Sequence, residues 1–158
     1  MQRLPLLLAC AALAPAAFGE DYPADAFAIC SACHLPDGAG VPGAFPPVRS
    51  RAARIATLDG GRDYLVRVVS FGLMGTIEVD GVQYFGVMAG NAGSMTPDAI
   101  AAALNYLVFE LNDGDAAGIE PFTADEVAGV QATVGAEGPA GAGEVRRALA
   151  DKHGERWP

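Results

Sequence analysis

Cys30 and Cys33 stand three positions apart, and His34 follows the second cysteine directly. On one helical turn, two thiols at this spacing can reach the two vinyl groups of a porphyrin and form thioether bonds with them. The histidine then lies beneath the ring, where one of its nitrogens can bind the iron. This pattern of two cysteines and a histidine is the signature of covalent haem attachment.

Two other chemistries use cysteines at this spacing, namely a redox disulfide and half of a zinc site. Neither requires a histidine directly after the second cysteine. Of the three cysteines and two histidines, only Cys10 and His153 remain, at opposite ends of the chain, so no second closely spaced Cys/His pair exists to complete a zinc site. We therefore expect one haem c, covalently attached at Cys30 and Cys33, with His34 as an iron ligand.

An iron that only carries electrons works best with a ligand on both faces, because a fixed ligand set changes little between the two oxidation states. The side chains that could supply the second ligand are Met74, Met88, Met95 and His153. We favour Met88, which follows a predicted hairpin on a glycine-flanked segment that should be irregular. Met95 and Met74 stay open as alternatives, since methionine also fills cores. His153 is expected to be solvated.

The elements that must position these residues are mostly short helices, which predicts an all-α domain with one small β-hairpin. Glycine and proline dominate 35–47, which predicts a loop around the haem edge. Alternating residues on both sides of Asp80-Gly81 predict a hairpin at 77–84. Apolar spacing and capping residues predict helices over 23–30, 62–71, 96–111, 123–134 and 144–153.

The N-terminus has the pattern of an exported protein. A basic residue, an apolar run and small residues follow one another in 1–19, as in a secretory signal peptide cleaved after Gly19. A lipoprotein box ending at Cys10 is the alternative, and would keep that cysteine as a lipid anchor. We expect a soluble periplasmic domain over 20–135, followed by a flexible tail over 136–158 that begins with a Gly/Ala/Pro link.

Charge and hydropathy restrict the partners. A net charge of −9 argues against nucleic acid as a partner. The most apolar later stretch, 99–111, is interrupted by Asn105 and Glu110, so we expect no membrane span. Five arginines lie within 41–67 and none between Arg67 and Arg146. This distribution fits either local ion pairs or a molecular dipole that orients the protein toward a partner.

Several motifs together resemble the class I c-type cytochromes. They are the haem motif, the glycine-rich loop 38–48 with Phe45-Pro46-Pro47, the hairpin with Tyr84-Phe85-Gly86-Val87-Met88, and Ala101 to Tyr106 in the closing helix. The likeness covers about 24–134. More narrowly, the chain resembles monohaem domains that serve, or are fused to, periplasmic dehydrogenases and some nitrite reductases.

The resemblance implies a class I cytochrome c fold with His34 and Met88 as the axial ligands and Tyr84 at the cofactor. It also implies that the Pro46 carbonyl accepts a hydrogen bond from His34, and that the first helix packs on the helix carrying Tyr106. Two departures stand out. Ala89 replaces a proline, which should leave the Met88 segment less rigid. Phe27 lies one position nearer the cysteines than usual.

We expect a periplasmic electron-transfer protein rather than an enzyme, because no catalytic constellation exists outside the haem motif. It would accept single electrons from a dehydrogenase and pass them toward a terminal oxidase or another cytochrome. Two alternatives remain. One is a permanent haem subunit of a larger oxidoreductase, anchored by Trp157 and the tail. The other is a five-coordinate ligand-binding or peroxidatic haem, made conceivable by Ala89.

Overall fold

The structure, a computed structural model, describes residues 22–134 and 138–158. The predicted signal peptide, 1–19, and the predicted lipid site at Cys10 lie outside these residues. In chain order the elements are η1 (Ala24–Phe27), α1 (Ala28–His34), α2 (Ala52–Ala56), α3 (Gly61–Phe71), β1 (Gly72–Val79), β2 (Val82–Ala89), α4 (Pro97–Asn105), η2 (Tyr106–Glu110), α5 (Ala124–Val134), α6 (Gly138–His153) and η3 (Gly154–Arg156).

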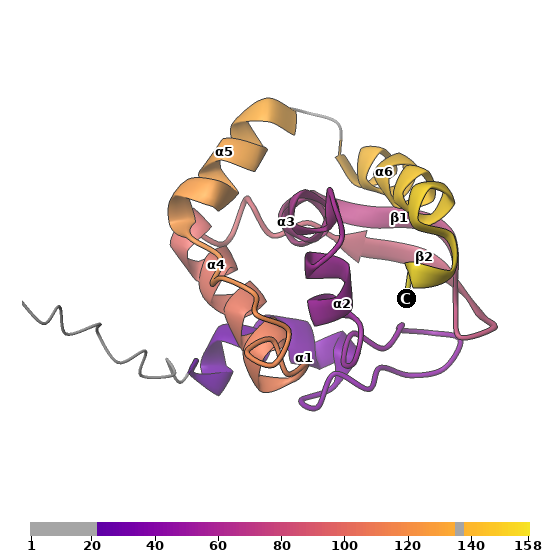
Figure 1. The fold of residues 1–158 in the computed structure, drawn as a ribbon, viewed down its shortest axis with the longest axis horizontal. Helices are drawn as coiled ribbons and strands as arrows, with labels where there is room; N and C mark the ends of the chain where they lie inside the picture. Colours follow the sequence, from indigo (N-terminus) through magenta and orange to yellow (C-terminus); the bar gives the residue numbers. More distant parts are fainter. Residues whose placement is uncertain (1–21, 135–137) are drawn as a thin grey trace, which may run out of the picture.

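Helices make up most of the fold, together with a single two-stranded antiparallel sheet in the part of the chain described. Figure 1 shows α3 near the centre, with α4 and α5 on one side and the hairpin and α6 on the other. The core lies between these helices, and its fully buried side chains are Val66, Ile100, Leu104, Val108 and Val127. The predicted combination of helices and one hairpin is confirmed; the short helix α2 was not predicted.

The helix that closes the fold begins as its sequence predicts. Thr96 Oγ1 accepts a hydrogen bond from the Ala99 amide at 3.2 Å, and Pro97 occupies the first helical position. The helix continues into η2, where the ring of Tyr106 stacks on Phe27 at 5.6 Å. This contact joins η2 to the N-terminal segment that leads into the two cysteines. In the described residues, no helix has both the length and the apolar character needed to cross a bilayer.

The hairpin is longer than predicted, and it includes Met88. The Asp80-Gly81 turn is as expected, with positive φ at both residues (51° and 76°), but the strands pair all the way from Gly72↔Ala89. Our expectation of an irregular Met88 segment was therefore wrong. The two mid-strand glycines, Gly75 and Gly86, lie opposite each other and leave the ladder intact. Alanine at position 89 also keeps an amide that proline would lack.

Residues 138–158 are folded, which corrects the predictions of a flexible link up to Gly143 and of a flexible tail for this part of the chain; the rest of both predictions, 135–137, lies outside the described residues. Within the described residues, α6 starts at Gly138 and packs against β1 and α3 (Figure 1). Leu149 is only 7% exposed and belongs to the main core. The glycine-rich composition of 138–143 concealed this helix, since burial of one apolar face outweighs a low helix propensity.

His153 was expected to be solvated and is instead buried. Its Nε2 lies 2.9 Å from the backbone carbonyl of Asp59, so the ring fastens the end of α6 to the loop before α3. Lys152 adds an exposed ion pair with the Asp59 carboxylate at 2.6 Å. His153 is thus engaged away from the haem motif and does not compete as an iron ligand.

Candidate functional site

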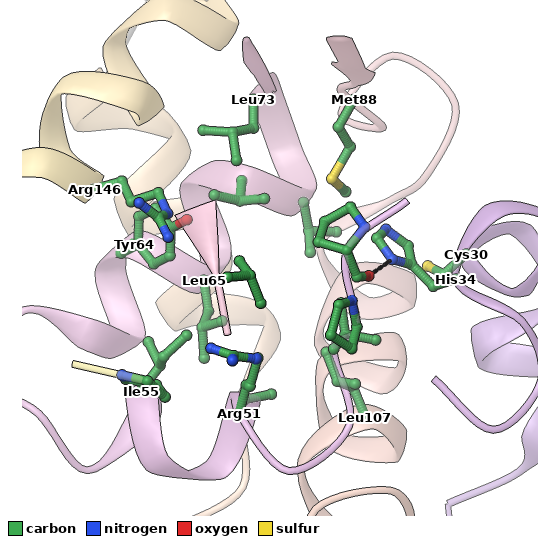
Figure 2. Close-up of a pocket in the computed structure, with 18 of the residues that line it drawn as sticks. Cys30, His34, Arg51, Ile55, Tyr64, Leu65, Leu73, Met88, Leu107 and Arg146 are labelled. Atoms are coloured by element: carbon green, nitrogen blue, oxygen red, sulfur yellow. Dashed lines mark hydrogen bonds between the residues drawn. The ribbon is translucent and has the colours of Figure 1, made fainter. Parts of the chain in front are cut away.

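An apolar cavity lies between the cysteine motif, α3, the hairpin and the last residues of the chain (Figure 2). It has about 830 Å³ of space outside protein atoms, open solvent included. Most of its wall is aliphatic or aromatic, and Arg51, His34 and Arg146 are the side chains there that can carry a positive charge. The cavity therefore suits a large apolar cofactor with a few anionic groups.

His34 is the last residue of α1 and is held in one orientation. Its side chain is buried (8% exposed), and Nδ1 donates a hydrogen bond to the Pro46 carbonyl at 2.8 Å. Because a carbonyl can only accept, this bond puts the proton on Nδ1 and leaves the lone pair of Nε2 free for a metal. Burial lowers the pKa of His34, although the bond to Pro46 opposes that shift. Burial favours the neutral imidazole, and the bond to Pro46 selects the tautomer of that imidazole that can bind a metal through Nε2.

Cys30 and Cys33 lie on the same short helix, one turn apart, as free thiols. Cys30 is partly buried in the cavity wall, and burial raises the pKa of its thiol. Cys33 is exposed and does not contribute to the cavity wall. The pair thus faces one rim of the cavity, with one sulfur inside and the other at the surface, beside His34.

Met88 reaches the cavity from the opposite side. In Figure 2 its side chain extends from β2 toward the His34 ring. The alternating pattern of the hairpin explains this direction: Met88 pairs with Leu73, which also lines the cavity, and the neighbouring pair, Met74 and Val87, faces outward. Met74 is accordingly 47% exposed. Met95 packs at the margin of the core and is not part of the cavity wall.

Gly72 permits the strand pairing that holds Met88. It has φ of 87°, and a Cβ atom there would lie 2.2 Å from the Met88 carbonyl oxygen. Any other residue at this position would force the two strands apart at the residue that lines the cavity. Tyr84, predicted at the cofactor, is buried (5% exposed) on the same strand as Met88 but is not among the residues of the cavity wall.

Sequence reasoning missed four residues of the wall, Arg51, Tyr64, Arg146 and Trp157. Burial raises the pKa of Tyr64 to about 12, partly opposed by the nearby Arg146 charge. The Trp157 ring packs edge-on against Tyr64 at 5.5 Å. These residues come from distant segments, and no local motif marks them. They became recognisable only because α6 folds back onto α3 and β1.

The amino-acid sequence of this chain is similar to those of two known cytochromes, which agrees with a haem site at this cavity. No family profile matches the chain. Cytochrome c-552 of Thermus thermophilus is 44% identical over 102 residues, which cover 64% of this chain and 77% of that protein. A second cytochrome c-552, from a named strain of the same organism, is likewise 44% identical over 102 residues, with 64% of this chain and 68% of that protein covered.

The residues present fit a covalently bound haem. A thiol pair at the attachment spacing stands at the rim of an apolar cavity, and a histidine with a free Nε2 lies next to it. Trp157, which lines the cavity, has a buried indole N–H that finds no hydrogen-bond partner among the described residues. Together with 44% identity to the two cytochromes c-552, these features show that the chain belongs to the class I c-type cytochromes, monohaem electron carriers that bind haem c covalently.

Proposed function

We propose that this cytochrome shuttles single electrons in the periplasm, accepting them from a dehydrogenase and passing them toward an oxidase. In this proposal Cys30 and Cys33 hold the haem, and His34 and Met88 are its axial ligands within a class I cytochrome c fold. The single observation that carries it is the convergence of His34 and Met88 from two distant segments on one apolar cavity.

Haem c, when bound, supplies an iron that alternates between the ferric and ferrous states. The chain supplies ligands that hardly move during this change. The Pro46 carbonyl fixes the His34 ring and raises its basicity as a donor. A methionine thioether favours ferrous iron and so raises the reduction potential. The apolar wall excludes water, which also disfavours the more highly charged ferric state.

The surface next to the haem motif suits brief encounters with redox partners. Ile29, Leu35 and Phe45 are large apolar side chains near Cys33, and each of them is exposed. Weak electron-transfer complexes use small interfaces, below roughly 1,200 Å². Exposed apolar side chains on the segments that flank the haem motif support transfer through a haem edge on this side of the molecule.

The periplasmic location rests on the three-part signal pattern in 1–19, and the dehydrogenase and oxidase rest on the resemblance in motifs. Edman sequencing or intact mass of the exported protein should show Glu20 as the first residue. A chain that starts at Met1 would contradict export through this signal. Co-purification from native membranes and periplasm would identify the donor and the acceptor.

The Trp157 ring packs edge-on against Tyr64 of its own chain. This contact favours a structural role for Trp157 within the domain over the anchoring role in a permanent subunit. We therefore retain a dissociable carrier as the proposal.

A redox titration of the holoprotein followed by visible absorbance tests this function. We expect a reversible one-electron Nernst curve and no uptake of carbon monoxide by the reduced protein at neutral pH, because both axial positions would be filled. Rapid binding of carbon monoxide would instead support the five-coordinate alternative, and would contradict the proposal.

A further inference from the structure

The two strands of the hairpin differ in what lies beside their outer edges. The edge of β1 is covered by α6: Arg146 donates to the backbone carbonyl of Glu78 at 2.9 Å, and a Cβ atom on Gly143 would lie 3.1 Å from the Met74 carbonyl oxygen. Figure 1 shows this helix on the β1 side of the hairpin. Among the described residues, β2 pairs only with β1, and no backbone hydrogen bond joins it to another segment. The outer edge of β2 is therefore free.

The register of the hairpin identifies the backbone groups on that free edge. A two-residue turn joins Val79 to Val82, so this closing pair exchanges two hydrogen bonds, and hydrogen-bonded and non-hydrogen-bonded pairs alternate from there. The pairing continues without a bulge over the whole length of both strands. Every second residue of β2 then directs its N–H and C=O away from β1. These residues are Gln83, Phe85, Val87 and Ala89, and each of them is exposed.

The free edge also lacks the features that keep exposed strands apart. Natural edge strands are usually protected by charged side chains, prolines, bulges or a covering segment. The strand Val82–Ala89 contains no charged residue and no proline, and its pairing has no bulge. Phe85 and Val87 are 82% and 66% exposed, and Met74 pairs with Val87 on the same outer face. The edge is thus open to another strand, with apolar side chains beside it.

A second copy of β2 fits this edge, because the strand is complementary to itself in antiparallel order. When Gly86 lies opposite its own copy, Phe85 lies opposite Val87 of the second copy, and Gln83 lies opposite Ala89. All these residues direct their backbone groups outward, so each such pair exchanges two hydrogen bonds. An aromatic ring next to a β-branched side chain is also a favourable cross-strand pair. A shift of the register by one residue would instead place outward groups opposite inward ones.

Charge also favours a second copy over a cationic partner at this edge. A cationic partner would find no carboxylate on β2. The net charge of −9 opposes self-association in general, but the nearest acid of the outer face, Glu78, lies on β1. In a sheet of the order β1-β2-β2-β1, the two outer strands are about 14 Å apart, because neighbouring strands are spaced by about 4.8 Å. This separation exceeds the screening length of about 8 Å at 0.15 M salt.

The area available indicates a weak dimer. A phenylalanine buries roughly 150–250 Å² when it is fully covered. The two Phe85 rings therefore supply only part of the roughly 1,200 Å² at which stable interfaces begin, and smaller interfaces belong to transient complexes.

We propose that two copies of this protein associate through the free edges of β2 and form a four-stranded antiparallel sheet, with the twofold axis at Gly86. The ring of each Phe85 then packs against Val87 of the other copy. This interface is independent of the haem ligation, because Gln83, Phe85, Val87 and Ala89 are not part of the cavity wall.

Sedimentation equilibrium of the reduced holoprotein tests the dimer. We expect a mass that rises with concentration toward twice that of the monomer, with a dissociation constant on the order of 0.1 mM, as for a transient complex. Higher salt should tighten the association, because it screens the repulsion between two negatively charged copies.

Phe85→Lys and Thr76→Lys form a matched pair of variants. Thr76 pairs with Phe85 on the same exposed face, and both variants add one positive charge, but Thr76 lies on the covered strand. Phe85→Lys should weaken association at least about tenfold, because it replaces the aromatic contact with a solvated charge. Thr76→Lys should change it by less than about twofold, since surface positions outside an interface contribute little.

Gln83→Pro separates backbone pairing from apolar contact. Gln83 directs its N–H outward, so proline removes a donor that the free edge uses and none that the hairpin uses. Association should weaken about fivefold or more, because both copies lose a backbone hydrogen bond. Gln83→Ala keeps that N–H and should associate like the wild-type protein. An unchanged ferric spectrum shows that each variant is folded around its haem.

A wild-type holoprotein that stays monomeric at about ten times the expected dissociation constant would overturn the proposal. Equal weakening by Phe85→Lys and Thr76→Lys would indicate stacking of the outer faces, and would also reject pairing through the edge. Association of Gln83→Pro at the wild-type strength would reject it as well, because backbone pairing would then contribute nothing.

Discussion

His34 and Met88 are each held by a backbone contact rather than by another side chain. The Pro46 carbonyl orients the His34 ring at 2.8 Å, and the close approach of Gly72 fixes the strand at Met88. Backbone atoms of packed elements move less than exposed side chains, so the two side chains that we propose as ligands are already oriented by the fold. Such preorganisation suits an electron carrier, whose ligands should stay in place when the iron changes its charge.

Gly72 provides a test of this arrangement. We expect Gly72→Ala to lower the free energy of unfolding by about 3 kcal/mol or more, because the new Cβ would overlap the Met88 carbonyl at a position with positive φ. The iron–sulfur bond should weaken as well. Guanidinium unfolding and the ferric absorption spectrum measure the two effects.

Gly75→Ala is the matched control on the same strand. Gly75 also has positive φ, 112°, but a Cβ there meets nothing within 4 Å. The control should cost about 1 kcal/mol through backbone strain alone and leave the ferric spectrum unchanged. Equal losses for the two variants would show that the approach to Met88 is not what Gly72 protects.

Residues with a local signature were predictable from the sequence, and residues brought together by tertiary packing were not. Cys30, Cys33 and His34 form one motif, and Thr96-Pro97 begins its helix as capping rules require. Met88, predicted as an axial ligand, does line the cavity, but it lies on a strand and not on the irregular loop that we expected; its ligation stays a prediction. Arg146 and Trp157 share no spacing with the motif, so only the fold reveals them.

At the level of elements, α6 is the largest departure from our expectation. Its first residues are mostly glycine, alanine and proline, which favours a flexible chain. The helix forms nonetheless because Ala142 and Leu149 are buried against β1 and α3, and because Arg146 and His153 bond to backbone carbonyls of other segments. Tertiary contacts therefore override the local composition here.

Leu149→Ala tests whether α6 contributes to the stability of the domain. Removal of a core leucine of this burial should cost about 2–4 kcal/mol in the free energy of unfolding. Arg147→Ala, at an exposed position of the same helix, should change it by less than about 0.5 kcal/mol. If Leu149→Ala had no effect on thermal or guanidinium unfolding, the segment would be the flexible tail that the composition predicts.

At the level of the whole molecule, the charge is strongly negative but the arginines do not form a free basic face. Arg49, Arg51, Arg62 and Arg67 each make an ion pair with a nearby carboxylate. Of the two interpretations of the 41–67 cluster, local pairing agrees better with these contacts than a strong dipole. The exposed pair Arg49–Asp37 adds little stability, and pairing of all four arginines leaves the overall negative charge to govern encounters.

Small inorganic oxidants of opposite charge test this electrostatic picture. With a net charge of −9, the reduced protein should react more slowly with rising salt when the oxidant is a cation such as tris(phenanthroline)cobalt(III). With the anion ferricyanide, the rate should rise. Both trends should level off once the screening length falls from about 30 Å at 0.01 M salt to about 8 Å at 0.15 M. Stopped-flow rates that show the same sign of salt dependence for both oxidants would contradict it.

The ferric absorption spectrum of Met88→Ala, compared with that of Met74→Ala, tests the central claim most directly. Both changes remove a methionine from the same hairpin, but only Met88 lines the cavity, whereas Met74 is 47% exposed on the outer face. We expect Met88→Ala to abolish the sulfur-to-iron charge-transfer band and to let the reduced protein bind carbon monoxide, while Met74→Ala keeps the wild-type spectrum. Persistence of the band in Met88→Ala, or its loss in Met74→Ala, would contradict His34/Met88 ligation.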